Sequence, residues 1–186
     1  MKTIGVLALQ GDYDAHSRCL RELGASVRLV RKAGELDELS ALVLPGGESS
    51  VMLNFLQREN FWEKLRAFAC DKPCFGTCAG AILLAAEVEN PEQPRLGALD
   101  IGIRRNAYGR QLQSAIRTAE SRLGGDPLEL VFIRAPRIIR TGPDVEVLAR
   151  FENDPVWVRQ GLLMATTFHP ELSQDRRVHA EFLRSV

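Results

Sequence analysis

Short apolar runs alternate with helical patterns over the first 86 residues, and this alternation constrains the fold more than any other feature. Between the runs stand segments whose apolar residues recur every three or four positions, as they do on one face of a helix. Strands that alternate with helices form βαβ units and a parallel sheet. The predicted strands are Met1–Leu9, Val27–Val30, Ala41–Leu44 and Pro73–Thr77.

Several of the predicted helices follow a residue that can cap a helix N-terminus. Ser, Asp and Asn side chains accept hydrogen bonds from the free backbone N–H groups of the first turn. Asp12 is expected to cap a helix that ends at Gly24 and buries Ala15, Cys19, Leu20 and Leu23. The other expected caps are Ser49 or Ser50, Asn60 with Glu63 in capping-box spacing, and Ser173. A further helix of small apolar residues is expected over Ala79–Ala86.

The pattern changes after Glu87–Gly97, a stretch with two prolines that we expect to be an exposed loop. Strands with few helices between them are predicted over Leu99–Ile103, Leu130–Ile133, Val145–Ala149, Val156–Arg159 and Leu162–Phe168. The prediction is therefore an α/β fold, a flavodoxin-like three-layer sandwich with a mostly parallel central sheet and a β-rich portion in the second half. Residues 1–186 are expected to form a single domain.

Composition excludes several classes of protein. The chain carries 24 Lys and Arg against 24 Asp and Glu, so it lacks the net positive charge of a nucleic-acid or membrane-surface binder. It contains no apolar run long enough to span a bilayer, and Ile4–Leu9 is too short for a signal-peptide core. We expect a cytoplasmic protein whose four cysteines are free thiols.

The sequence Gly76-Thr77-Cys78-Ala79-Gly80 lies where a predicted strand meets a predicted helix. It has the spacing of a nucleophile elbow, in which two glycines let the strand and the helix approach each other around a tight turn. The Cys78 thiol would project above the sheet edge at a helix N-terminus, which favours a thiolate. The Ala79 N–H would be placed to donate to an oxyanion.

Two other interpretations of Cys78 remain open at this point. Free cysteine is often a small buried packing residue, and this is the interpretation given to Cys19, Cys70 and Cys74. Cys70, Cys74 and Cys78 also invite a metal site, but their spacing is not a usual zinc pattern and the predicted elements would separate the sulfurs. No metal is expected.

The segment His169-Pro170-Glu171 follows the last predicted strand and supplies a candidate base. A cysteine nucleophile needs a group that takes or holds its proton. In an extended segment residues i and i+2 share one side, so Glu171 can reach the His169 ring and fix its tautomer. The alternative is a solvated surface turn. His16 and His179 are expected to be solvated surface residues.

The turn Pro45-Gly46-Gly47 also joins a predicted strand to a predicted helix. Glycines let backbone N–H groups face inward, which suits a second oxyanion donor at Gly46 or Gly47. A phosphate-binding loop is a rival interpretation, but neither common glycine-rich phosphate motif is present. A plain strand-to-helix turn is the third possibility.

These motifs together resemble the class I glutamine amidotransferases, and among them the glutaminase subunits of pyridoxal 5′-phosphate synthase (the PdxT/SNO family). The Gly-x-Cys-x-Gly and His-x-Glu motifs mark the wider class. The stretches that carry the closer resemblance span nearly the whole chain. They are Ile4–Gly11, Leu44–Ser50, Phe75–Gly80, Arg105–Gln111, Val131–Pro136 and Phe168–Glu171.

The resemblance implies roles for individual residues. Cys78 would be the nucleophile, and His169 with Glu171 would complete a catalytic triad. Glutamine would be bound by Gly47, Glu48, Ser49, Arg105, Ile133 and Arg134. A substrate with an α-carboxylate and an α-ammonium requires one cation and one anion or carbonyl, which arginine and backbone groups can supply.

The implied reaction is hydrolysis of L-glutamine to L-glutamate and ammonia, with no cofactor. The implied partner is the (β/α)8-barrel synthase subunit of pyridoxal 5′-phosphate synthase, in a hetero-oligomer that receives the ammonia. Two alternatives remain: a glutaminase of another pathway, such as histidine or cobyric acid synthesis, or a redox-sensing thiol protein on the same scaffold. The role of Phe151–Asp154 is not assigned by the sequence.

Overall fold

The computed structural model describes residues 2–58, 60–105, 107 and 114–186. Within them a seven-stranded sheet runs in the order β10-β11-β12-β4-β3-β1-β2. The strands from β12 to β2 are parallel, and β11 is antiparallel to both of its neighbours. Their bounds are β1 Thr3–Leu7, β2 Ser26–Val30, β3 Ala41–Leu44, β4 Cys74–Thr77, β10 Glu146–Phe151, β11 Asp154–Gln160 and β12 Leu163–Thr166.

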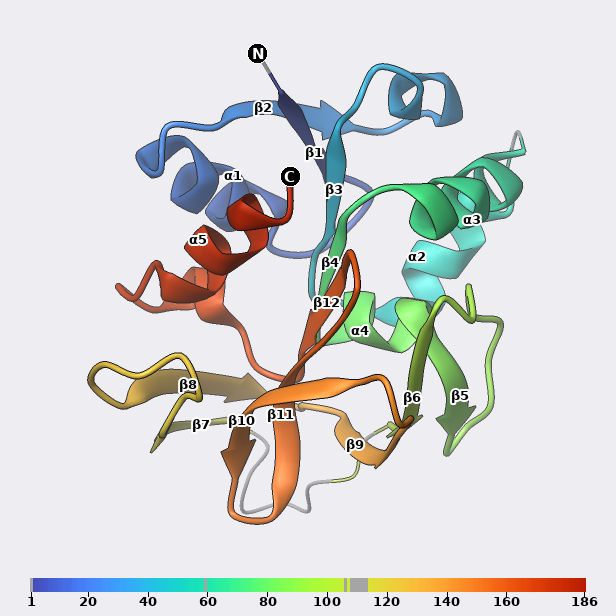
Figure 1. Ribbon diagram of the computed structural model, residues 1–186. Coiled ribbons are helices and arrows are strands. Elements are labelled where there is room, and N and C mark those ends of the chain that lie inside the picture. The colour runs from blue at the N-terminus through green and yellow to red at the C-terminus, as the bar shows by residue number, and fades with distance from the viewer. Residues whose placement is uncertain (1, 59, 106, 108–113) are drawn as a thin grey trace.

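Helices cover both faces of this sheet (Figure 1). α1 (Tyr13–Glu22) and α5 (Arg177–Arg184) lie on one face, while α2 (Ser49–Leu56), α3 (Phe61–Asp71) and α4 (Ala79–Leu84) lie on the other. Two short 3₁₀ helices, η1 (Ala33–Leu36) and η3 (Pro170–Leu172), complete the described helical elements. The predicted α/β three-layer class with a mostly parallel central sheet is confirmed.

Burial on both faces explains why the central strands are continuous apolar runs. All four residues of β3 are buried. Leu42 and Leu44 pack in the cluster beneath α2, α3 and α4, whereas Ala41 and Val43 pack in the cluster beneath α1 and α5. Successive strand residues point to opposite faces, so a strand covered on both sides has no polar positions.

The second half adds two small sheets. One contains β5 (Ala85–Glu89), β6 (Leu99–Arg104) and β9 (Arg137–Thr141), and the other pairs β7 (Ser114–Ala119) with β8 (Leu128–Ile133). The β-rich portion was predicted, but β5, β7 and β9 were not. β5 begins inside the helix expected over Ala79–Ala86 and continues into the stretch expected to be an exposed loop, where Gln93 and Leu96 are also buried.

The predicted caps were wrong in detail. Asp12 and Asn60 do stand before α1 and α3, but neither side chain makes a capping hydrogen bond. Ser49 lies inside α2, and its hydroxyl donates to Gln93 Oε1 at 2.8 Å. α5 begins after Arg176, not Ser173. For Ser49 and Ser173 a tertiary contact or a shifted helix start replaces the local hydrogen bond that the sequence favours.

No helix of the described residues combines the length and the apolar character needed to cross a membrane.

Two glycines let β4, β3 and α4 approach each other closely. A Cβ atom on Gly80 would lie 1.9 Å from the Leu44 carbonyl oxygen, and one on Gly76 would lie 2.6 Å from the Gly80 backbone. Any side chain there must push α4 away from the sheet. The crowding expected from the spacing of Gly76 and Gly80 is therefore present.

We expect Gly80→Ala to lower the free energy of unfolding by about 1–3 kcal/mol or more, because the added methyl overlaps backbone that cannot rotate away. Gly34→Ala is the matched control, since no atom lies within 4 Å of its added methyl; a change within about 0.5 kcal/mol is expected. Urea denaturation of both variants measures the difference. Equal midpoints would contradict the close approach of α4 to β3.

Candidate functional site

Four connections meet at the carboxyl edge of the parallel strands. They follow β1, β3, β4 and β12, and they carry Gln10–Asp12, Gly46–Glu48, Cys78 and His169. The pairing of β12 with β4 places Thr166 beside Thr77, so Cys78 and His169 leave the sheet side by side. In open α/β sheets ligands bind at this edge.

A cavity of about 320 Å³ opens between these connections. Eight of the residues predicted for the site contribute to its lining: Gly47, Glu48, Ser49, Cys78, Arg105, Ile133, Arg134 and His169. Sequence reasoning missed the other lining residues, Gln10, Gly11, Asp12, Ile82 and Pro136. A volume of this size is suited to a small molecule rather than to a polymer.

Cys78 occupies a strained turn between β4 and α4. Its φ of 47° and ψ of −100° lie outside the regions that L-residues favour. The Cys78 N–H donates to the Thr166 carbonyl at 2.9 Å, and the Cys78 carbonyl accepts the first hydrogen bond of α4 from Ile82. The surrounding backbone therefore holds the sulfur at the cavity wall. Ala79, the predicted oxyanion donor, is buried directly behind it as the first residue of α4.

His169 contacts both of its predicted partners. Its Nδ1 lies 2.7 Å from Glu171 Oε1, and the ring lines the same cavity as Cys78, whose side chain raises the pKa of His169. The Glu171 side chain is fully buried. The segment is not extended as predicted, because Pro170–Leu172 forms η3, yet the helical turn still directs Glu171 back to the ring. Gly46 faces the ring as well: a Cβ there would lie 2.4 Å from His169 Cε1.

The surroundings of His169 favour the protonated form of its ring. Burial by itself lowers the pKa of His169, but the interactions with Cys78 and Glu171 outweigh burial and raise the pKa to about 10. A neighbouring imidazolium stabilises a thiolate, which is the nucleophilic form of cysteine. The arrangement can therefore support nucleophilic attack followed by proton donation.

The expected substrate-binding residues also line the cavity. Glu48 and Arg134 are exposed, Arg105 is half-buried, and all three line the cavity with Ile133. Arg134 has a φ of 45°, a second strained backbone at the site. The motif Arg105–Gln111, which carried part of the resemblance, is described only at Arg105 and Ala107; the rest lies outside the described residues.

Three of the lining residues that sequence reasoning missed, Gln10, Gly11 and Asp12, contact the Gly46–Glu48 turn or His169. Gln10 Oε1 accepts a hydrogen bond from the Glu48 N–H at 2.7 Å, and a Cβ on Gly11 would lie 1.7 Å from the Gly46 carbonyl oxygen. Asp12, expected to cap α1, instead places Oδ2 3.6 Å from His169 Nδ1. The sequence does contain an indication of this placement. Gln10-Gly11-Asp12 follows the first strand of a parallel sheet, and the loops that follow the other strands lie at the same edge.

Two expectations about histidine were wrong. His16 and His179 were expected to be solvated, but both are fully buried, and His16 Nδ1 lies 2.9 Å from His179 Nε2. Burial lowers the pKa of His16 well below its usual value, and His179 and His169 add to this effect. Burial, and then Arg176, lowers the pKa of His179 to about 4. Both rings are neutral at physiological pH.

The expectation that Cys19, Cys70 and Cys74 are buried packing residues was wrong for one of the three. Cys19 and Cys74 are buried, as packing residues should be, but Cys70 is exposed. All four described cysteines are free thiols.

Asp12, His169 and Glu171 bring ligand atoms within 4.8 Å of one another. A ring that holds both of its protons offers no lone pair, so this group suits proton transfer better than metal binding.

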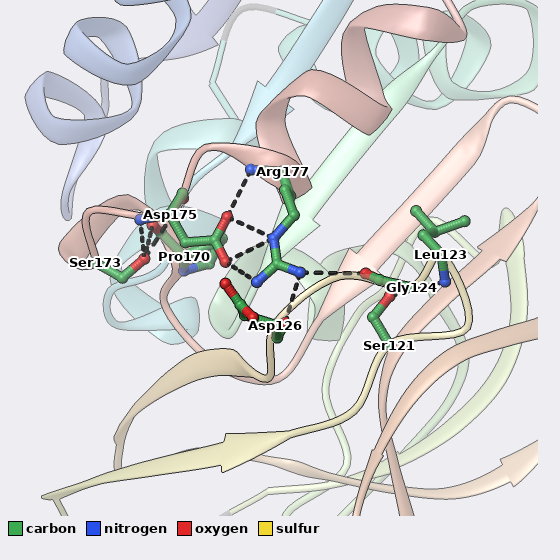
Figure 2. Close-up of polar contacts among 8 residues, drawn as sticks. All are labelled: Ser121, Leu123, Gly124, Asp126, Pro170, Ser173, Asp175 and Arg177. Atoms are coloured by element: carbon green, nitrogen blue, oxygen red, sulfur yellow. Dashed lines mark hydrogen bonds and ion pairs between the residues drawn. The ribbon is translucent and has the colours of Figure 1, made fainter.

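The segment that holds Glu171 is anchored by Arg177 (Figure 2). Arg177 forms a bidentate pair with Asp175, from Nε to Oδ1 and from Nη2 to Oδ2, and donates from Nη1 to the Gly124 and Asp126 carbonyls at 3.2 and 2.6 Å. The Ser173 hydroxyl, expected to cap α5, donates to the Pro170 carbonyl at 3.3 Å. η3 and α5 are thereby tied to the loop that precedes β8.

Comparison with known proteins gives the family. The model of the SNO glutamine amidotransferase family matches residues 6–186. The chain belongs to that family. A pyridoxal 5′-phosphate synthase subunit PdxT from Koribacter versatilis is 60% identical, over 98% of this chain and 95% of that protein. The PdxT subunit from Solibacter usitatus is 47% identical over the full length of both chains.

Solved structures agree with this family assignment. The crystal structure of a glutamine amidotransferase superimposes with a TM-score of 0.91 at 45% identity, covering 98% of this chain and 97% of that one. A putative GMP synthase subunit from Thermoplasma acidophilum superimposes with a TM-score of 0.70 at 21% identity, which shows a shared fold. The resemblance predicted from the motifs is confirmed.

The raised pKa of His169 predicts a pH-dependent contribution to stability. The unfolded imidazole has a pKa near 6.5, so this contribution is complete below about pH 6.5 and is lost as the pH rises through about 10. Glu171→Gln removes one of the partners that raise the pKa. We expect the difference in free energy of unfolding between the parent and this variant to narrow over that interval, as measured by urea denaturation.

Glu22→Gln is the matched control, because it breaks an exposed ion pair with Arg176, and arginine keeps its charge over this range. Its difference from the parent should stay constant from pH 6.5 to 10. A constant difference for Glu171→Gln as well would show that His169 is not protonated through the Glu171 contact.

Proposed function

We propose that this protein hydrolyses L-glutamine to L-glutamate and ammonia and delivers the ammonia to a synthase subunit for pyridoxal 5′-phosphate formation. The observation that carries this proposal is that Cys78 and His169 line one small cavity, with His169 Nδ1 2.7 Å from Glu171 Oε1. Membership of a glutamine amidotransferase family gives that geometry its reaction class.

Cys78, His169 and Glu171 act as the catalytic triad. The Cys78 thiolate attacks the side-chain amide carbon of glutamine, and the protonated His169 donates its proton to the leaving ammonia. The ring then takes a proton from water, which hydrolyses the thioester and releases glutamate. Glu171 keeps the His169 Nδ1–H oriented throughout, at the observed 2.7 Å.

The backbone N–H groups of Ala79 and of Gly46 or Gly47 stabilise the oxyanion that forms in both steps. The placement of Gly46 against the His169 ring and of Ala79 directly after Cys78 supports this proposal. Glutamine is bound by Gly47, Glu48, Ser49, Arg105, Ile133 and Arg134. Arginine pairs with the α-carboxylate, and Glu48 accepts from the α-ammonium.

The partner follows from the relatives, which are named as subunits of pyridoxal 5′-phosphate synthase. We propose a (β/α)8-barrel synthase partner in a hetero-oligomer, located in the cytoplasm, and a single glutaminase domain over residues 1–186. The two hydrophobic clusters flank one sheet, which supports one domain. Ammonia released without a partner would diffuse into the solvent, whereas a bound synthase subunit can receive it directly.

Cys78→Ala or His169→Asn should reduce ammonia release from glutamine by at least about 10³-fold without unfolding the protein, because either change removes a reacting group. A coupled assay for glutamate and a thermal melt measure the two properties. Cys70→Ser is the matched control, since Cys70 is an exposed thiol away from the cavity, and its activity should equal that of the parent. Full activity in Cys78→Ala would refute the assignment.

Glutaminase activity should rise when the synthase subunit of pyridoxal 5′-phosphate synthase is added. A glutaminase that is activated by this partner releases ammonia only when a subunit that can use it is bound. The measurement is the rate of glutamate formation across a titration of the synthase. The ammonia-accepting subunit of a histidine-pathway enzyme serves as the control partner and should leave the rate unchanged. Equal rates with and without the synthase would count against this partner.

A further inference from the structure

A continuous polar path leads from Glu171 through two buried rings to α5. Glu171 Oε2 lies 3.3 Å from His16 Nε2, and His16 Nδ1 lies 2.9 Å from His179 Nε2. The same His16 Nε2 lies 3.1 Å from the hydroxyl of Thr77, the residue that precedes Cys78. His16 comes from α1 and His179 from α5, and neither ring is exposed. The mechanism proposed above uses neither ring.

The protons on this path have one favourable arrangement. Each neutral ring carries a single N–H, and the two nitrogens that face each other must be one donor and one acceptor. If His16 carried its proton on Nδ1, its Nε2 lone pair would face the Glu171 carboxylate, and a buried His179 Nδ1–H would have no acceptor among the described residues. The proton of His16 therefore belongs on Nε2, and that of His179 on Nε2 as well.

Glu171 needs such a donor. Its carboxylate is fully buried, and His169 engages only Oε1. Among the described residues Oε2 has no partner with full hydrogen-bond geometry. The His16 Nε2–H points to Thr77 Oγ1 and presents its positive end to Oε2 at 3.3 Å. A buried carboxylate oxygen without any such contact would be costly.

We propose that His16 is a positioning residue for the proposed triad: its Nε2–H holds the Glu171 carboxylate and the Thr77 hydroxyl at once. One ring thereby fixes the orientation of the carboxylate that orients His169 and of the residue that leads into Cys78. His179 sets the tautomer of His16 by donating to its Nδ1. This inference rests on the proposed glutaminase function.

The placement separates this role from substrate binding. His16 lies behind the triad, outside the described lining of the cavity. Its ring also packs edge-on against Phe75, with centroids 6.1 Å apart. The alternative to a positioning role is therefore that His16 only fills the core, in which case its replacement would act through packing alone. A positioning residue changes kcat while leaving KM unchanged, and it can be replaced by a side chain that presents the same N–H.

His16→Gln and His16→Asn form the matched pair of variants. A glutamine amide can place its N–H where the ring has Nε2–H, whereas the shorter asparagine reaches only the position of Nδ1. We expect His16→Gln to keep kcat within a few-fold of the parent, and His16→Asn to lose about 10- to 100-fold, as is typical for groups that orient a functional side chain. KM for glutamine should stay within about twofold in both variants, since each leaves the cavity lining untouched.

Glutaminase kinetics of the parent and both variants, with thermal midpoints, test the proposal. Equal kcat for the two variants, better rescue by asparagine, or kcat losses that follow the thermal midpoints would overturn it. Nitrogen-15 NMR of the histidine rings in the unmodified protein supplies a readout that requires no activity and no variant. It should show His16 protonated at Nε2, and protonation at Nδ1 would overturn the proposal. An inactive parent would instead refute the proposed function.

Discussion

The parallel pairing of β4 with β12 is the constraint on which the site depends. It sets Thr77 beside Thr166, and the Cys78 N–H then donates to the Thr166 carbonyl at 2.9 Å. A slip of β4 by one residue would exchange its two faces, so that Cys74 and Phe75 would enter the wrong hydrophobic clusters. The packing of the core thus specifies the register, and the register specifies which side chains emerge together. The sulfur and the imidazole meet because two buried strands can pair in only one way.

Strain at the site is maintained by the same packing. Cys78 and Arg134 both have positive φ without being glycine, a conformation that costs about 1–3 kcal/mol per residue. Cys78 is held between the Thr166 carbonyl on one side and the first turn of α4 on the other. Gly80 brings that turn against the Leu44 carbonyl, where no side chain fits. Relaxing the turn would require α4 to separate from β3, and the buried apolar residues of α4 oppose that movement.

The sequence predicts those parts of the molecule that local patterns determine. β3 and β4 were placed closely, because strands buried on both faces are uninterrupted apolar runs. Cys78, His169 and Glu171 were brought together by the spacing of their motifs. β7 was missed because most of its residues are exposed and only pairing with β8 makes it a strand. His16 was misjudged because its neighbours in α1 are polar, and its burial depends on Thr77 and His179, which come from distant parts of the chain.

The choice of a neutral ring behind Glu171 has an electrostatic consequence. An arginine in the place of His16 would stabilise the carboxylate more strongly, but its charge would also repel the proton on His169 and lower the pKa of that ring. A neutral imidazole supplies an oriented N–H without a competing charge. Cys78 and Glu171 can therefore raise the pKa of His169 to about 10 although burial opposes it. Burial and the neighbouring His179 and His169 rings lower the pKa of His16, whereas Cys78 and Glu171 raise the pKa of His169.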